Sequence, residues 1–204
     1  METLFIDFAN PRMIEKIVAL KPTKGYCILL DITGSTRLKD KPEKDWMIEL
    51  YNTFALMRTF FLFLRPLKCI GDELMFYISE TETKRVFGSP LGLFTSVCSI
   101  TNEWEKWFKS VKASIVYCEN AYAISFVKGA SDIYGKEIDL AARLIAEAKA
   151  RQIVMGESFY HVLEPAYARY GSALQVPEFS KVIGPVTKRL KGFRAKQNFY
   201  TIQF

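Results

Sequence analysis

The stretch that decides the fold reads GYCILLDITGST and spans residues 25–36. Residues 26–30 form an apolar run of strand length, rich in aromatic and branched side chains, which predicts a short buried strand. Asp31 stands where this run ends, and residues 33–36 supply a small-residue loop with backbone amide donors. A carboxylate at a strand end beside such a loop can hold a divalent cation against phosphate groups. Taken alone, however, the stretch is explained better as a strand followed by an Asp/Gly turn.

Length and charge narrow the class of protein. With 204 residues, half of them hydrophobic and a quarter charged, the chain has the composition of one globular domain. Its net charge of +6 suits a polyanionic ligand, which includes nucleoside triphosphates, nucleic acid and membrane surfaces. Residues 181–204 contain six Lys or Arg residues and no Asp or Glu, which indicates one anion-binding surface. No nucleic acid partner is expected, because basic and aromatic residues are not interleaved on a recognisable surface.

Cysteine and histidine usage argues against several kinds of site. The four cysteines lie apart inside apolar runs without a C-x-x-C pair, so we expect reduced core residues rather than disulfides or a zinc site. The single histidine, His161, argues against a histidine-based triad or a multi-histidine metal centre. The amino terminus lacks a signal-peptide pattern, and the most apolar segment, residues 54–64, is too short to span a bilayer. We therefore expect a cytoplasmic protein without membrane insertion.

Hydrophobic periodicity and turn residues predict the order of the elements. Gly71 and Asp72 stand between two strand-like runs, an Asx/Gly signal for a tight hairpin. The expected elements are a helix within 13–20, a strand at 26–30, a helix at 43–64, hairpin strands at 67–70 and 73–78, a loop at 81–90, a helix at 91–109, strands at 111–118 and 122–127, a helix at 135–151, a strand at 152–155, a helix at 157–163 and two strands within 182–204. This order predicts an α+β fold with a ferredoxin-like βαββαβ core. Residues 1–24 are expected to form a helical extension, and residues 25–204 a single domain.

Four motifs carry a resemblance to a known family. They are Leu30-Asp31-Ile32-Thr33-Gly34-Ser35-Thr36, Lys68-Cys69-Ile70-Gly71-Asp72, Asp132-Ile133-Tyr134-Gly135 with Asp139 and Arg143, and Leu190-Lys191-Gly192-Phe193. Each motif alone is a weak signal, but four of them in this order and at these separations form a specific one. From residue 25 to residue 204 the chain resembles the class III nucleotidyl cyclases, the catalytic domains of bacterial and animal adenylyl and guanylyl cyclases.

The resemblance implies a site for two divalent cations. Asp31 and Asp72 match the two metal-binding aspartates of the family, and the carbonyl of Ile32 matches a further ligand. Oxygen ligands suit Mn2+ or Mg2+, which are expected between the triphosphate and the ribose 3′-oxygen. The phosphates are expected to lie against the backbone amides of four loop residues, Thr33, Gly34, Ser35 and Thr36.

The resemblance also assigns residues that face the substrate. Arg143 matches the arginine that binds charge developing on the α-phosphate in the transition state. Lys191 matches a lysine that holds the outer phosphates, and the basic carboxyl-terminal segment supports this assignment independently. Lys68 and Asp132 match the pair that reads the edge of the base, and Ile133 follows Asp132 in the same base-binding motif.

One position departs from the family pattern. Asp139 stands where most of the family has an asparagine that helps to orient the ribose, and an ionised carboxylate cannot donate a hydrogen bond. Asp139 and Arg143 are four residues apart on a predicted helix, so an exposed intrahelical ion pair is the structural alternative. Because Arg143, Lys191 and the two metal aspartates remain, an active enzyme is favoured over a catalytically silent module that binds nucleotide and regulates through dimerisation.

The resemblance further implies the partners and the substrate. In the family the metal aspartates come from one subunit, whereas the base-reading pair, the arginine and the phosphate-binding lysine come from its partner, so we expect a head-to-tail homodimer with two composite sites. Free-standing chains with the Leu-Asp-Ile-x-Gly-Ser-Thr opening look most like the bacterial pyrimidine cyclases of antiphage defence, which signal to a separate effector protein. We therefore expect conversion of UTP to cyclic UMP and pyrophosphate. Lys68 and Asp132 are nevertheless typical of adenylyl cyclases, so conversion of ATP to cyclic AMP is the alternative.

Overall fold

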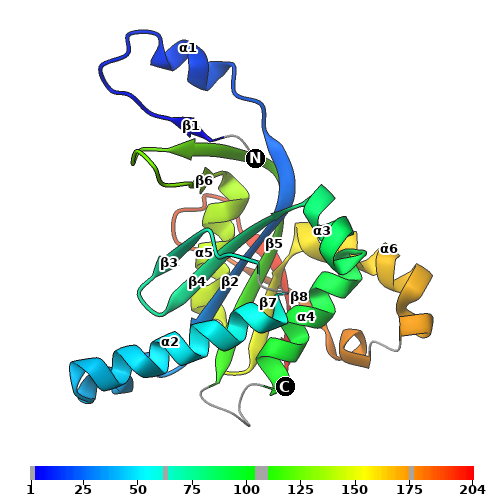
Figure 1. Ribbon diagram of the computed structural model, residues 1–204. Coiled ribbons are helices and arrows are strands. Elements are labelled where there is room, and N and C mark those ends of the chain that lie inside the picture. The colour runs from blue at the N-terminus through cyan, green and yellow to red at the C-terminus, as the bar shows by residue number, and fades with distance from the viewer. Residues whose placement is uncertain (1–2, 62–63, 104–109, 175–176) are drawn as a thin grey trace.

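The computed structural model describes residues 3–61, 64–103, 110–174 and 177–204 (Figure 1). Its strands are β1 (Leu4–Phe5), β2 (Thr23–Ile32), β3 (Lys68–Ile70), β4 (Glu73–Ser79), β5 (Val111–Ser125), β6 (Ile133–Tyr134), β7 (Gln152–Gly156), β8 (Ile183–Lys188) and β9 (Gln197–Gln203). Its helices are α1 (Met13–Val18), α2 (Glu43–Phe60), α3 (Glu80–Phe87), α4 (Pro90–Glu103), α5 (Lys136–Glu147) and α6 (Glu157–Leu174). Short 3-10 helices lie at Ser35–Asp40 and Pro177–Lys181.

The strand β2 is an interior strand of the sheet, because it pairs in antiparallel fashion with β4 on one side and with β5 on the other. The main sheet has the strand order β3-β4-β2-β5-β7-β9-β8. The first four of these strands, with α2 and α4 between them in the chain, form the predicted ferredoxin-like βαββαβ core. After a crossover through α5, β7 joins β5 in parallel, and β9 and β8 complete the sheet. The predicted α+β fold is confirmed.

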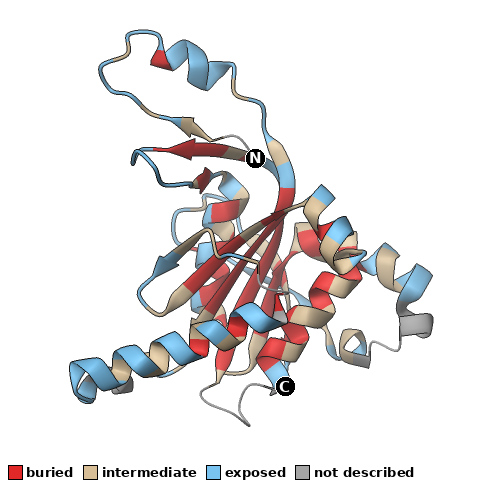
Figure 2. Cartoon of the chain, in the orientation of Figure 1, coloured by how far each residue is buried: buried red, intermediate tan, exposed pale blue. Residues whose placement is uncertain are grey.

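Helices cover both faces of the central strands, which explains why β2 is apolar without alternation. Figure 2 shows the buried residues concentrated along these strands and on the helix faces turned toward them. On one face, Ile28 and Leu30 belong to a core with aromatic side chains from α4, α6 and the residue after α2, namely Phe94, Phe159 and Phe61. On the other face, Cys27 and Leu29 pack in a second core built on α5. Because strand residues alternate between faces, Asp31 lies on the α5 side of the sheet.

The prediction of a loop at residues 81–90 is wrong, because the chain forms α3 there. The Ser79 hydroxyl oxygen accepts a hydrogen bond of 3.2 Å from the amide of Glu82, which caps the start of the helix. Most of α3 is solvated, and Thr83 is its buried residue. The segment is polar because it is a surface helix, and polarity alone does not separate a surface helix from a loop.

The prediction of two strands at 111–118 and 122–127 is also wrong, because β5 is one strand of 15 residues. The exposed pair Glu119 and Asn120 resembles a turn in the sequence. In the structure the chain stays extended there, and its register against β2 shifts so that Ala121 pairs with Thr23. The strand then goes on to pair with β6 and β1. Tertiary pairing therefore overrides the local turn signal. The strand β1 itself is absent from the sequence-based prediction.

Several helix boundaries differ from the prediction. The helix α2 ends at Phe60 rather than 64, and α5 ends at Glu147 rather than 151. The helix α6 continues through Pro165 to Leu174 instead of ending at 163, because its later turns still pack against the core through Ala166 and Tyr167. The helix predicted at 91–109 is confirmed as far as Glu103, and residues 104–109 lie outside the described residues. The expected strand at 152–155 and the closing pair of strands are confirmed.

The stack of Phe76 on Phe61 gives a test of the core, since their ring centroids are 4.6 Å apart and both residues are fully buried. We expect Phe76→Ala to lower the free energy of unfolding by about 3–5 kcal/mol, because it leaves a cavity between β4 and α2. Urea denaturation followed by circular dichroism measures the change. Tyr51→Ala, at a residue on α2 that is 71% exposed, is the control and should alter stability by less than about 0.5 kcal/mol. Similar losses in the two variants would contradict this description of the core.

Candidate active site

Asp31 is the middle member of a charged row across three strands. In the sheet register, Asp31 of β2 lies opposite Glu73 of β4 and opposite Lys112 of β5. Directly opposed residues of antiparallel strands carry their side chains on the same face. The Lys112 ammonium lies 2.9 Å from an Asp31 carboxylate oxygen, and both side chains are 19% exposed. Strand register alone therefore places an ammonium and a second carboxylate beside Asp31.

The turn between β3 and β4 brings Asp72 to the same place. Ile70 pairs with Glu73, so Gly71 and Asp72 form the predicted two-residue turn. Gly71 has a φ of +65°, in the left-handed region that glycine adopts without strain. The Asp72 carboxyl interacts with that of Asp31 through a hydrogen bond and through charge, and both interactions raise the pKa of Asp31. The hairpin thus supplies the second predicted metal-binding carboxylate.

A pocket of about 460 Å³ joins these acids to the loop that follows β2. All the predicted metal-binding and loop residues line it, namely Asp31, Ile32, Asp72, Thr33, Gly34, Ser35 and Thr36. Glu73 and Lys112 line it as well, and so does Lys149 from the segment after α5. The structure therefore brings the motif around Asp31 and the motif around Asp72 together in one pocket, which we call the acidic half-site.

The charges in this half-site disturb one another. Burial raises the pKa of Asp31, the Lys112 ammonium lowers it, and Asp72 raises it again, so that the net shift is upward. Burial together with the charges of Asp31 and Asp72 raises the pKa of Glu73 to about 7, against the opposing effect of Lys112. Burial first and the neighbouring carboxylates second thus disfavour the ionised carboxyl groups, and a bound cation would favour them.

The donor atoms fit a hard divalent cation whose coordination is completed by its substrate. Asp31 and Asp72 offer carboxylate oxygens, and the hydroxyl oxygen of Thr33 is buried with no hydrogen-bond partner among the described residues. In the part of the chain that the structure describes, no group of three or more His, Cys, Asp or Glu side chains could hold a metal ion by itself. Because Mg2+ and Mn2+ take about six ligands, two carboxylates leave positions for phosphate oxygens and water.

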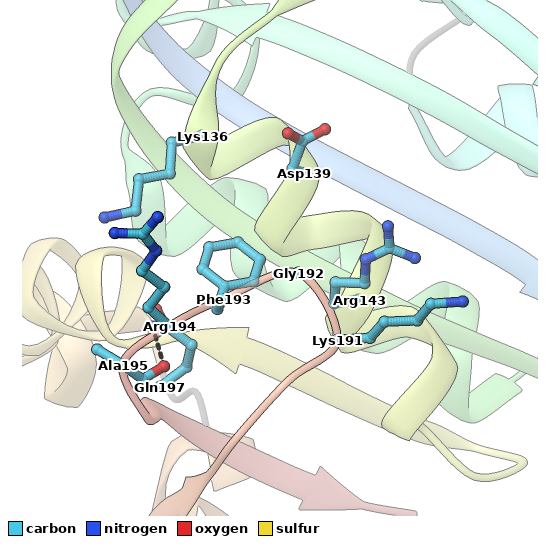
Figure 3. Close-up of a pocket in the computed structure, with 9 residues that line it drawn as sticks. All are labelled: Lys136, Asp139, Arg143, Lys191, Gly192, Phe193, Arg194, Ala195 and Gln197. Atoms are coloured by element: carbon cyan, nitrogen blue, oxygen red, sulfur yellow. Dashed lines mark hydrogen bonds between the residues drawn. The ribbon is translucent and has the colours of Figure 1, made fainter.

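A second pocket, of about 620 Å³, gathers the predicted phosphate-binding lysine and the two predicted catalytic residues. Asp139 and Arg143 reach it from α5, and Lys191 reaches it from the loop between β8 and β9 (Figure 3). Lys136 and Arg194 also line it, so four cationic side chains surround the single carboxylate among its lining residues. In Figure 3 the Asp139 carboxylate points away from the Arg143 guanidinium, and no ion pair joins them among the described residues. The exposed intrahelical ion pair is therefore not formed, and the pocket is suited to a polyanion.

The loop that carries Lys191 is anchored on α5 by its apolar residues. Leu190 is buried and belongs with Phe193 to the core built on α5. The amide of Phe193 donates a 3.1 Å hydrogen bond to the carbonyl of Leu190, closing a turn around Gly192, whose φ is +89°. Apolar residues on either side of Lys191 and Gly192 thus hold the exposed Lys191 next to Arg143.

The predicted base-reading residues form a third group. The Lys68 ammonium donates a hydrogen bond of 2.7 Å to an Asp132 carboxylate oxygen, and both side chains are partly buried. The same oxygen accepts a 2.8 Å hydrogen bond from the amide of Ile133, which is buried in the core on the α5 side. The structure therefore pairs Lys68 at the start of β3 with Asp132 just before β6, although 64 residues separate them in sequence.

The acidic and cationic halves are separate on one chain. The metal-binding residues line one pocket, while Arg143 and Lys191 line another. The sequence-based prediction omits five charged side chains that line these pockets, namely Glu73, Lys112, Lys149, Lys136 and Arg194. Glu73 is adjacent to Asp72 and Arg194 lies in the basic carboxyl-terminal segment, which are available sequence signals. No sequence signal identifies Lys112, because only strand register places it beside Asp31.

Comparisons with known proteins show the fold. No protein-family model matches the chain. No curated protein matches it either. Among solved structures, the chain is similar to the adenylyl cyclase CyaB from P. aeruginosa, with 16% identity and a TM-score of 0.69 over 90% of this chain and 95% of that one. A rhodopsin-guanylyl cyclase catalytic core with converted specificity, solved with ATPalphaS, has 18% identity and a TM-score of 0.69, covering 89% and 96% of the two chains. The guanylate cyclase domain of RhGC from Catenaria anguillulae, solved with GTP, has 14% identity and a TM-score of 0.63, covering 89% and 96%.

The chain therefore has the fold of class III adenylyl and guanylyl cyclase catalytic domains. The likeness extends over nearly the full length of those domains. In addition, no helix in the described ranges combines the length and the hydropathy that crossing a membrane requires.

The raised pKa of Glu73 predicts a pH dependence of stability in the metal-free protein. Glu73 ionises near its ordinary pKa of 4.5 in the unfolded chain but near 7 in the folded one, so the folded state binds more protons between these values. The free energy of unfolding should therefore fall as the pH rises through this window, by roughly 1–3 kcal/mol. Chemical denaturation in EDTA at a series of pH values measures the slope. Glu73→Gln should remove most of it, whereas Glu43→Gln, at an exposed residue of α2, should leave it unchanged. The same slope in wild type and Glu73→Gln would show that Glu73 titrates normally.

Proposed function

We propose that the protein is a metal-dependent nucleotidyl cyclase, which converts a nucleoside triphosphate to its 3′,5′-cyclic monophosphate and pyrophosphate. The observation that carries this proposal is the meeting of Asp31 and Asp72 in one pocket with the small-residue loop at 33–36. Four sequence motifs of the class III cyclases fall on this pocket, on the cationic pocket and on the Lys68–Asp132 pair. The fold of the whole chain supports the same reaction class. Site residues, reaction and fold are thus consistent with one another.

In the proposed site, Asp31 and Asp72 hold two divalent cations with the carbonyl of Ile32. Bound cations would lower the pKa of the ribose 3′-hydroxyl and stabilise the pyrophosphate leaving group. The backbone amides of residues 33–36 orient the triphosphate beside these carboxylates. The chain holds these groups on a paired strand and a two-residue turn, so that little rearrangement is needed when substrate binds.

The cationic residues act on the phosphates. The Arg143 guanidinium offers several donors in a planar fork, which suits the charge that develops on the α-phosphate during ring closure. Lys191, on the anchored loop, binds the outer phosphates and thereby orients the leaving group. Asp139 in place of the usual asparagine changes the ribose contact from a donor to an acceptor, which suits a ribose hydroxyl that donates.

We propose a head-to-tail homodimer, because the two halves of the site line separate pockets on one chain. In this arrangement Asp31 and Asp72 of one subunit face Arg143 and Lys191 of its partner, and each dimer has two composite sites. On a single subunit, the metal-binding residues and the residues that bind the phosphates lie in different pockets, so they would not act on the same nucleotide. Residues 25–204 form the catalytic domain in this proposal, with residues 1–24 as an extension.

For the base we propose uracil, with cyclic UMP as a second messenger for a separate effector protein in bacterial antiphage defence. The opening motif at residues 30–36 supports this subgroup. The intact Lys68–Asp132 ion pair supports a second candidate, an adenylyl cyclase that makes cyclic AMP. A closed pocket discriminates bases because a donor or acceptor left unpaired costs about 1–3 kcal/mol. A catalytically silent nucleotide-binding module is the third candidate, motivated by Asp139.

The deciding experiment incubates the purified protein with Mn2+ and each of the four nucleoside triphosphates in turn, with mass spectrometry of the products. We expect cyclic UMP from UTP. Cyclic AMP as the main product would assign the adenylyl alternative, and nucleotide binding without turnover that Asp139→Asn does not restore would favour the silent module. No product and no binding with any nucleotide, at protein concentrations that give dimers, would contradict the cyclase proposal.

Single substitutions test the metal assignment. We expect Asp31→Ala and Asp72→Ala each to lower turnover by at least about a hundredfold, because each removes a ligand that the cations need. Steady-state rates and circular dichroism spectra should be recorded together, so that loss of activity is separated from loss of fold. Asp45→Ala, which removes an exposed carboxylate near the start of α2, is the matched control and should keep the wild-type rate. Wild-type rates for Asp31→Ala would show that the metal is bound elsewhere.

A further inference from the structure

Lys112 is a cation in the acidic half-site that the proposed reaction does not use. It is the second residue of β5, between the fully buried Val111 and Ala113, and it pairs with Asp31 of β2. Strand pairing therefore fixes its backbone beneath the pocket that its side chain lines. The ammonium contacts the Asp31 carboxylate at 2.9 Å with 19% of the side chain exposed, unlike a solvated surface lysine.

Lys112 meets an electrostatic need of the metal-free protein. Asp31, Asp72 and Glu73 converge on one pocket, and partly buried carboxylates need a compensating charge. The Lys112 ammonium supplies a positive charge to Asp31. A divalent cation bound by Asp31 would supply positive charge to the same carboxylate. The ammonium and the cation therefore compete for Asp31 and repel each other at short range.

We propose that Lys112 is a positioning residue that takes the place of a divalent cation at Asp31. It keeps the acidic half-site ordered before metal binds, and it weakens the binding of free metal. This inference rests on the proposed function, because it takes Asp31 as a metal ligand. A cation that arrives with a nucleoside triphosphate brings its own anionic oxygens, with which the displaced ammonium can pair. Lys112 thereby favours the metal–nucleotide complex over the bare cation.

The test is a titration of Mn2+ into the metal-free, full-length protein, in which electron paramagnetic resonance reports the free Mn2+. We expect Lys112→Met to bind Mn2+ about tenfold more tightly than wild type, because one repelling charge is gone. Lys112→Arg keeps the charge and should bind within about twofold of wild type. The control is Lys149→Met, because the exposed Lys149 lines the same pocket and carries the same charge. It should shift the affinity by less than about threefold.

Several results would overturn the inference. Unchanged or weaker Mn2+ binding by Lys112→Met, in a variant with a native circular dichroism spectrum, would contradict it. If Lys112→Met does not fold, Lys112→Gln takes its place with the same expectation, since glutamine is polar but uncharged. If wild type binds Mn2+ in an Asp31-dependent manner and the Lys112 variants do not differ from it, this inference alone fails. If neither wild type nor the variants show Asp31-dependent binding, the proposed metal site fails as well.

Discussion

The pairing of β2 with β4 and β5 is the constraint on which the rest of the structure depends. Both edges of β2 are hydrogen-bonded to neighbouring strands and both of its faces are covered by helices. Pairing and packing therefore fix the positions of its residues. Asp31 stands at the end of this buried strand, where the apolar run stops and the pocket opens. The same pairing carries Glu73 and Lys112 to its two sides. A rigid strand end is a favourable base for a metal site, because ligand positions are set by the fold rather than by substrate.

Much of the fold could be predicted from the sequence, because local signals and tertiary structure agree. The apolar run before Asp31, the Gly71-Asp72 turn and the helix from Lys136 each carry their structure in neighbouring residues. The errors arise where tertiary contacts decide. The strand β5 passes through Glu119 and Asn120 because β6 and β1 pair with its far end, and α6 passes through Pro165 because its later turns still pack on the core.

The candidate site, like the fold, could be predicted from the sequence only in part. Motifs identify Asp31, Asp72, Arg143 and Lys191, and the structure assigns the first two and the last two to different pockets. Lys112 could not be predicted, because its role depends on the register between two strands that are about 80 residues apart in the chain. The division of the site into an acidic and a cationic half is likewise invisible in the order of the motifs. It follows from the sheet, which sets the end of β2 apart from the loop between β8 and β9.

The central claim is that the acidic half of one subunit and the cationic half of another make one active site. Its most direct measurement mixes two inactive variants, Asp31→Ala and Arg143→Ala, and follows cyclic nucleotide formation after subunit exchange. Each mixed dimer retains one site with both wild-type halves, so random exchange should restore about a quarter of the wild-type activity. The separate variants, each incubated alone, should remain inactive. A mixture that stays as inactive as its components, although mixed dimers form, would contradict the shared site.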